Sequence, residues 1–195
     1  MRIRNQTALL ETPPLQLRLA ARELRRGAVV ACPTEAVWGF SCDPLNQQAV
    51  TTLLTLKDRP AEKGLILVAA HLDQLAYFIE PPSRTALRRA RDTWPGPATW
   101  VFPASPHTPP WITGAFDTVA VRVTAHPVLA ALCARFGGAL VSTSANRSGQ
   151  PPCRSVTDVR LRFDPRLRVV PGATGGRAVP TPIREAATGH LLRRG

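Results

Sequence analysis

Short apolar runs alternate along this chain with segments whose apolar residues recur at helical spacing. Leu17, Ala20, Ala21 and Leu24 would share one face of a helix, whereas Ala28–Cys32 is a short apolar run that a proline ends. Chains that alternate such segments fold as α/β proteins, in which helices cover a sheet. A length of 195 residues with 44% hydrophobic content is enough to fill one core, and no internal repeat or linker is visible. The sequence therefore predicts a single α/β domain over residues 1–195.

Caps, breakers and periodicity place the expected elements. Pro13 and Pro127 stand at the first turns of two helices, and Asn46 is a typical cap for a third. We expect helices at 13–27, 72–79, 83–94, 127–136 and 156–163, and one that Asn46 caps and Pro60 ends. We expect strands at 28–32, 37–42, 64–70, 98–104, 119–123, 139–141 and 169–170, and a terminal hairpin over 183–193. A proline-rich loop is expected after residue 104, through Pro110.

The chain is strongly basic, since 25 lysine and arginine residues face 13 acidic ones and give a net charge of +12. That imbalance favours polyanionic partners, although a bias in composition that only aids solubility would give the same total. No apolar stretch approaches the length of a membrane span, and the apolar run after Met1–Asn5 is too short for a signal peptide. We therefore expect a cytoplasmic protein without membrane contact.

The four cysteines carry no metal-binding pattern. Cys32, Cys42, Cys133 and Cys153 show neither C-x-x-C spacing nor a matching pair of histidines. A disulfide framework is not indicated either. We expect all four to be reduced and buried as small apolar side chains, and we predict no protein metal site.

Only two of the 25 basic residues are lysines, and they lie six positions apart on either side of Arg59. Since arginine serves elsewhere in the chain, Lys57 and Lys63 indicate a place where a compact ammonium is required and a guanidinium is not equivalent. Three cations in this segment could converge on a triphosphate. Chance clustering, or a solvated charge cluster at the end of a helix, would give the same pattern. Lys57 continues an apolar helix stripe, so it either snorkels outward or lines a pocket, and we do not expect it to pack in the core.

Two polar segments follow predicted strands directly. Ser142–Asn146 offers three hydroxyls and an amide, which suit phosphate and ribose oxygens beyond the end of a strand, although an ordinary Ser/Asn turn would look the same. Pro33–Gly39 is the second segment. In it Thr34 could bond a small polar substrate, Glu35 could act as a cap or stand near a metal, and Gly39 permits close backbone approach.

Arg122 lies in the middle of a predicted strand, where a covered guanidinium needs an anion. A protein carboxylate and a ligand would both satisfy it. Common nucleotide and hydrolase signatures are missing from the sequence: it has no G-x-x-x-x-G-K-[ST], G-x-G-x-x-G, H-E-x-x-H or G-x-S-x-G. A nucleotide would therefore have to be bound in another way.

Five motifs in a fixed order, spanning nearly the whole chain, resemble the YrdC/TsaC family in its short bacterial form. They are Pro33–Gly39, Lys57–Leu65, Trp94–Pro97, Val119–Arg122 and Ser142–Asn146. The resemblance implies a twisted mixed sheet flanked by helices, with a concave, positively charged face. It also implies L-threonylcarbamoyladenylate synthase activity, in which L-threonine, bicarbonate or CO2 and ATP give threonylcarbamoyl-AMP and pyrophosphate for tRNA modification. Mg²⁺ is expected to accompany the ATP.

The same resemblance assigns roles to individual residues. The expected catalytic set, around the phosphates, is Lys57, Arg59, Ser144 and Asn146. The expected substrate-binding set is Thr34, Lys63, Arg122, Ser142, Thr143 and Arg193, with Thr34 at the threonine site and Arg193 closing over ATP. The sequence departs from longer relatives at Thr181–Ile183, where those have Ser-Thr-Ile or Val, and it lacks their additional domain.

Two other functions compete with the synthase. A non-catalytic RNA-binding or ribosome-maturation module would also be basic, but the chain has no basic motif interleaved with aromatic residues. A carbamoyl-transfer domain of a hydrogenase-maturation protein would need acylphosphatase and zinc-finger segments. Downstream tRNA-modification proteins are the expected partners, and direct RNA contact is left open. The synthase hypothesis requires Lys57, Arg59, Lys63 and Ser142–Asn146 to meet around one adenylate.

Overall fold

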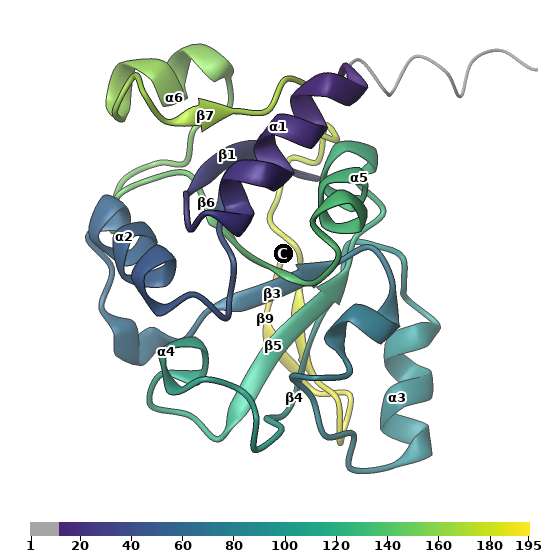
Figure 1. Ribbon diagram of the computed structural model, residues 1–195. Coiled ribbons are helices and arrows are strands. Elements are labelled where there is room, and N and C mark those ends of the chain that lie inside the picture. Colours follow the sequence, from purple (N-terminus) through teal and green to yellow (C-terminus); the bar gives the residue numbers. More distant parts are fainter. Residues whose placement is uncertain (1–11) are drawn as a thin grey trace, which may run out of the picture.

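The computed structural model describes residues 12–195, which fold around a nine-stranded mixed sheet with helices on both sides (Figure 1). The strand order is β7-β1-β2-β6-β3-β5-β4-β8-β9. This is the single-domain α/β architecture that the alternation of segments predicts. Met1–Asn5, with the start of the predicted domain, lies outside the described residues.

The helices are α1 (Pro14–Arg25), α2 (Gln47–Lys57), α3 (Arg84–Arg91), α4 (Pro110–Thr113), α5 (Pro127–Phe136) and α6 (Val156–Arg162). Two 3₁₀ turns are η2 (Ala61–Lys63) and η3 (Leu72–Leu75). The strands are β1 (Val30–Pro33), β2 (Trp38–Ser41), β3 (Ile66–Ala69), β4 (Thr99–Pro103), β5 (Thr118–Val123), β6 (Leu140–Ser144), β7 (Arg168–Val169), β8 (Ile183–Glu185) and β9 (Leu191–Arg193). Strands β3 and β5 run parallel, whereas β6 and β4 run antiparallel to them on either side.

Three expected elements were wrong in extent or kind. The helix expected over 72–79 is only the turn η3, because the chain buries Leu75 and then bends so that Ile79 bridges Ala104. The helix expected over 83–94 ends at Arg91. The proline-rich loop is present as expected, and the short helix α4, which buries Ile112, follows it from Pro110. Strand β6 also extends through Ser144, so the polar segment begins inside the strand.

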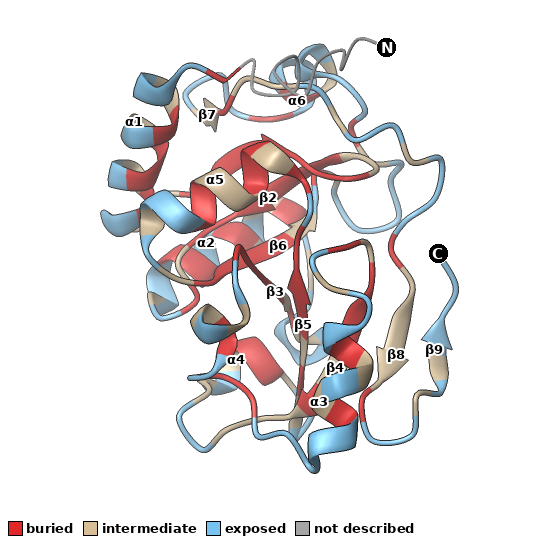
Figure 2. Cartoon of the chain, turned by 90° about the vertical axis from the view of Figure 1, so that its right-hand side faces the viewer, coloured by how far each residue is buried: buried red, intermediate tan, exposed pale blue. Residues whose placement is uncertain are grey.

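Both faces of the sheet carry apolar side chains, as alternation along a covered strand requires. In β3, Leu67 belongs to a cluster that includes α2, α3 and α4, whereas Val68 belongs to a second cluster with α1 and α5. Figure 2 shows the buried side of α1 turned toward the sheet and its exposed side toward solvent. All four cysteines are free and buried, as expected from their spacing.

Local sequence determines where the helix that leads to the lysines begins and ends. The side chain of Asn46 accepts a hydrogen bond from the Ala49 N–H at 3.0 Å, which satisfies one free donor at the start of α2. The helix ends at Lys57 and is followed by Asp58, which has φ 50° in the left-handed region. Because the backbone reverses at Asp58, the side chains of Lys57 and Arg59 point in different directions.

Candidate functional site

A row of side chains crosses four adjacent strands on one face of the sheet. Ile66 of β3 is the register partner of both Ser142 of β6 and Ala120 of β5, and Ala120 is in turn the partner of Val101 of β4. Directly opposed residues point to the same face and lie side by side. This is the face that α1 and α5 cover elsewhere, since Val68 and Leu140 lie two residues further along the same strands. The row therefore lies on an open part of an otherwise covered face.

A cavity of about 380 Å³ opens over this row. Its lining residues are Arg59, Lys63, Gly64, Leu65, Ile66, Val101, Ile112, Thr113, Phe116, Thr118, Ala120, Ile183, Leu192 and Arg193. The floor is apolar, and Phe116 stands at the rim with 58% of its surface exposed. A cavity with an apolar floor and a few polar groups on its walls is the usual form of a small-molecule site.

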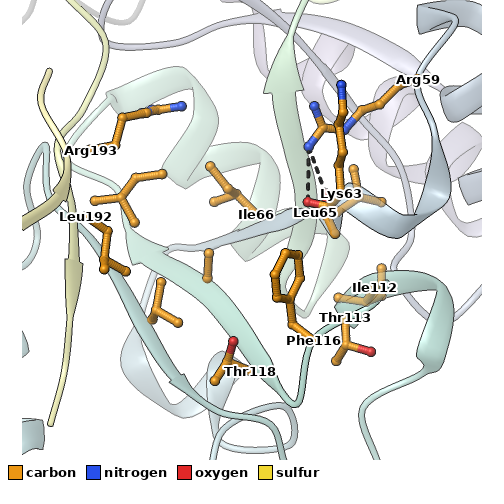
Figure 3. Close-up of a pocket in the computed structure, with 14 residues that line it drawn as sticks. Arg59, Lys63, Leu65, Ile66, Ile112, Thr113, Phe116, Thr118, Leu192 and Arg193 are labelled. Carbon is orange, nitrogen blue, oxygen red and sulfur yellow. Dashed lines mark hydrogen bonds between the residues drawn. The ribbon is translucent and has the colours of Figure 1, made fainter.

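Three cations line the cavity walls. Arg59 and Lys63 lie on one side and Arg193 on the other, with Ile66 between them (Figure 3). Arg59 donates from Nη2 to the carbonyl oxygens of Gly64 at 2.9 Å and Lys63 at 3.3 Å. Burial and then the charge of Arg193 lower the pKa of Arg59, and burial and then the charge of Arg122 lower the pKa of Arg193. An anion in the cavity would relieve this repulsion.

Lys57 occupies a different position from the one its sequence context suggests. The side chain is 3% exposed, so the expectation that it would stay out of the core is wrong. Its ammonium donates to the carbonyl oxygens of Ser144 and Asn146, the latter at 2.9 Å, and lies 3.5 Å from Asn146 Oδ1. Burial, followed by the charge of Arg59, lowers the pKa of Lys57 to about 8. Lys57 thus supports the polar segment from behind, while Arg59, on the other side of the left-handed Asp58, reaches the cavity.

The polar segment after β6 is held in a fixed turn. Ser144 Oγ donates to Asn146 Oδ1 at 2.5 Å, and Asn146 Nδ2 donates to the carbonyl oxygens of Arg147 and Gln150. The Lys57 carbonyl also accepts from the Ser148 N–H at 2.7 Å. The structure therefore brings Lys57, Ser144 and Asn146 together, as the hypothesis requires. Asn146 itself borders a neighbouring hollow rather than the main cavity.

Ser142 and Thr143 point to opposite faces of the sheet. Ser142 continues the cavity row beside Ile66. Thr143 is the register partner of Phe40, which belongs to the cluster under α2. Successive side chains of a strand alternate between faces. The structure therefore does not place the Thr143 side chain with the expected substrate-binding set.

Thr34 lies in the turn between β1 and β2, next to the end of β6. Its hydroxyl donates to the Val37 carbonyl at 2.8 Å. Gly39 is the register partner of Ser144, and a Cβ on Gly39 would lie 3.0 Å from the Thr143 carbonyl oxygen and 3.1 Å from Thr34 Cγ2. The close packing that Gly39 permits brings Thr34 to the same end of the sheet as Ser144.

Arg122 finds its anion within the protein. Its Nη2 lies 3.2 Å from Glu35 Oε2, and the two side chains are 7% and 9% exposed. Nη1 donates to Thr181 Oγ1 at 3.0 Å. The sequence leaves open whether a protein carboxylate or a ligand pairs with Arg122, and in the structure the carboxylate of Glu35 does so. Within residues 12–195, the buried Nε of Arg122 has no hydrogen-bond partner, which leaves one donor for another oxygen.

The apolar floor was missed by sequence reasoning. Ile66, Val101 and Ala120 look like ordinary core residues in a one-dimensional pattern. Alternation predicts which residues of a single strand share a face, but these three lie on different strands, and only the register shows that they form one row beside Ser142.

In the part of the chain that the structure describes, no group of three or more His, Cys, Asp or Glu residues is arranged to hold a metal ion. No helix among residues 12–195 is long and apolar enough to cross a membrane.

Known proteins are similar to this chain in both sequence and fold. The profile of the Sua5/YciO/YrdC family, described as "Telomere recombination", matches residues 22–195. The threonylcarbamoyl-AMP synthase of Halorhodospira halophila is 56% identical over 184 residues, which cover 94% of this chain and 96% of that protein. A variant of P. abyssi Sua5 superposes with a TM-score of 0.90 at 32% identity, over 96% of this chain and 59% of that one. The same Sua5 complexed with L-threonine gives a TM-score of 0.82 at 33% identity, over 91% of this chain. This chain covers 53% of the Sua5 chain in that complex, which is about half of its length.

Proposed function

The chain belongs to the Sua5/YciO/YrdC family, and we propose that it is a threonylcarbamoyl-AMP synthase that condenses L-threonine, bicarbonate or CO2 and ATP. The observation that carries this proposal is the 56% identity with a synthase over 94% of the chain, together with a cavity whose walls bring three cations to an apolar floor. The product, threonylcarbamoyl-AMP, would serve tRNA modification.

The chemistry needs little from the protein beyond positioning and charge. The neutral amine of threonine adds to bicarbonate with loss of water, or to CO2 with loss of a proton, and a carbamate results. A carbamate oxygen then attacks the α-phosphorus of ATP, the bond from that phosphorus to the bridging oxygen breaks, and pyrophosphate leaves. Fixed cations that neutralise charge on the phosphates and on the leaving group lower the barrier to such a step.

The cavity suits ATP by its shape and charge. The apolar row of Ile66, Ala120 and Val101 offers an apolar surface for the base, and the cations Arg59, Lys63 and Arg193 line the same cavity. Lysine acts on phosphates as a point charge and arginine as a two-pronged donor. We assign the nucleotide to this cavity.

Threonine is expected at the other end of the row. Ser142 and Ser144 point to the cavity face, and Thr34 lies beside them through the contact at Gly39. The free Nε of Arg122 could bond a substrate oxygen. The Sua5 of P. abyssi has been crystallised with L-threonine, which supports a threonine site in this fold. Lys57 is assigned a supporting role, since its ammonium bonds the backbone of Ser144 and Asn146.

Mg²⁺ is proposed to arrive with the nucleotide. The residues that line the cavity include three cations, which suit phosphate oxygens. A magnesium ion held mainly by phosphate and water needs few protein carboxylates, and it would share the negative charge that develops on pyrophosphate. Handover to downstream tRNA-modification proteins, contact with RNA and a cytoplasmic location remain predictions.

The decisive experiment is pyrophosphate release by the purified protein, followed with and without threonine and bicarbonate. We expect release that needs both, and a product with the mass of threonylcarbamoyl-AMP. A folded protein that releases no pyrophosphate under these conditions would refute the synthase and favour a binding module.

A further inference from the structure

A network of buried polar contacts connects the Thr34 turn with the cavity wall. It begins at Glu35, whose Oε1 accepts from Thr124 Oγ1 at 2.7 Å and whose Oε2 lies 3.2 Å from Arg122 Nη2. Arg122 links Glu35 to Thr181, because its Nη1 donates to Thr181 Oγ1 at 3.0 Å. Glu35, Arg122 and Thr181 are all at least nine-tenths buried. A buried network of this kind fixes the segments that supply its members.

Thr181 is the point where this network meets the C-terminal hairpin. Its carbonyl oxygen accepts from Arg193 Nη2 at 3.0 Å, and its hydroxyl lies 3.3 Å from Thr99 Oγ1. Strand β8 begins two residues later and pairs with β4, and its partner β9 ends at Arg193. Thr181 therefore contacts Arg122 through its hydroxyl and Arg193 through its carbonyl, so it lies between the buried network and the cavity wall.

The segment before Thr181 is also fastened to the Thr34 turn. The N–H groups of Gly175 and Arg177 donate to the carbonyl oxygens of Thr34 at 2.9 Å and Glu35 at 3.0 Å. A Cβ on Gly175 would lie 2.9 Å from the Glu35 carbonyl oxygen, so the two backbones are in close contact. In Figure 1 this C-terminal segment runs from the β7 end of the molecule to the hairpin beside β4.

We infer that Glu35 is a positioning residue, which holds Arg122 and, through Thr181, sets the place of Arg193 over the nucleotide cavity. The two ends of the site, the Thr34 turn and the Arg193 wall, are thereby parts of one polar network. This inference rests on the proposed function, because the role of Arg193 there is to contact ATP. Glu35 itself does not line the cavity.

The test compares four single variants with the wild type. Glu35→Gln removes the charge that holds Arg122 and keeps the shape. Thr181→Val removes the hydroxyl at nearly constant volume, and Thr181→Ser keeps the hydroxyl. Glu23→Gln is the control, because Glu23 also pairs with an arginine, Arg168 at 2.6 Å, and neither of these two residues lines the cavity.

The kinetic readout is the KM for ATP, measured separately from kcat and from the KM for threonine. We expect Glu35→Gln and Thr181→Val to raise the KM for ATP about tenfold, the effect of losing one hydrogen bond to a charged group. Thr181→Ser and Glu23→Gln should stay near the wild-type value. Adding Glu35→Gln to Arg193→Ala should raise the KM for ATP no further, because Glu35 acts through Arg193. Independent, multiplying effects in that double variant would overturn the inference, as would an unchanged KM in Thr181→Val.

A second readout does not depend on activity. Amide hydrogen exchange of residues 183–193 should be faster in Glu35→Gln and Thr181→Val than in wild type, and unchanged in Glu23→Gln. If the wild type makes no product, the proposed function fails, and the exchange rates still decide the positioning role. If Glu35→Gln does not fold, the Thr181→Val and Thr181→Ser pair decides it. Equal exchange in Thr181→Val and wild type would refute the positioning role.

Discussion

The ammonium of Lys57 donates a hydrogen bond to the backbone carbonyl of Asn146 at 2.9 Å, across 89 positions of sequence. Lys57 is the last residue of α2, and Asn146 lies just beyond β6. The contact joins two motifs that the sequence presents separately. It makes Lys57 a support for the turn that carries Ser144 and Asn146, whereas Arg59, two residues later, lines the cavity.

Lys57→Ala and Arg59→Ala should both abolish synthase activity, but only the first should weaken the fold. Lys57→Ala leaves two part-buried carbonyl oxygens without their donor and removes a buried side chain, which costs about 2–4 kcal/mol of unfolding free energy. Arg59 is only half-buried, so its loss should cost about 1 kcal/mol or less. Urea unfolding of the two variants measures the contrast. Equal stability of both variants would show that Lys57 is not a structural support.

The stability contributed by Lys57 should rise with pH between about 8 and 10.5. Burial lowers the pKa of Lys57 in the folded chain from 10.5 to about 8. In that window the unfolded chain binds a proton at Lys57 that the folded chain does not, so the free energy of unfolding increases with pH.

The measurement is the stability difference between wild type and Lys57→Met at pH 7.5, 9 and 10. We expect the difference to shift in favour of the wild type as pH rises. A difference that is independent of pH would contradict the lowered pKa.

Ala120→Leu should block the nucleotide cavity from its floor. The Ala120 side chain lies in the row with Ile66 and Val101, so a larger side chain there takes up space that the base needs. We expect the KM for ATP to rise about tenfold or more and the unfolding free energy to change by about 1 kcal/mol or less. Ala120→Ser, which adds little volume, is the control. Normal ATP kinetics in Ala120→Leu would move the nucleotide out of this cavity.

Gly39→Ala should impair threonine use more than ATP use. The added Cβ would come within 3.1 Å of Thr34 Cγ2 and 3.0 Å of the Thr143 carbonyl oxygen, so Thr34 must shift. We expect a higher KM for threonine with a nearly unchanged KM for ATP. Gly138→Ala, where the new Cβ meets only the Phe136 ring at 3.6 Å, should behave as wild type. If the KM for ATP rises instead, Thr34 belongs to the nucleotide end of the site.

The periodicity of the apolar residues and the positions of proline and glycine are sufficient to predict most of the helices and strands. The stripe of α1, the Asn46 cap of α2 and the terminal hairpin are local features, encoded within a few residues, and the structure has them where they were expected. The segment 72–79 was misread because its apolar spacing fits a helix, whereas tertiary contacts at Leu75 and Ile79 favour a 3₁₀ turn and a bridge. Local pattern is a weak guide where packing overrides propensity.

By itself, the sequence determined the α/β class, the buried reduced cysteines and the residue types that gather at the site, because each depends on composition or on spacing within one segment. Tertiary structure decided which of those residues meet. It turned Lys57 inward and Arg59 outward, paired Arg122 with Glu35, and set Thr143 on the face opposite Ser142. The physical reason is that strand register and a left-handed turn at Asp58 fix the directions of side chains, and both depend on contacts between segments far apart in the chain.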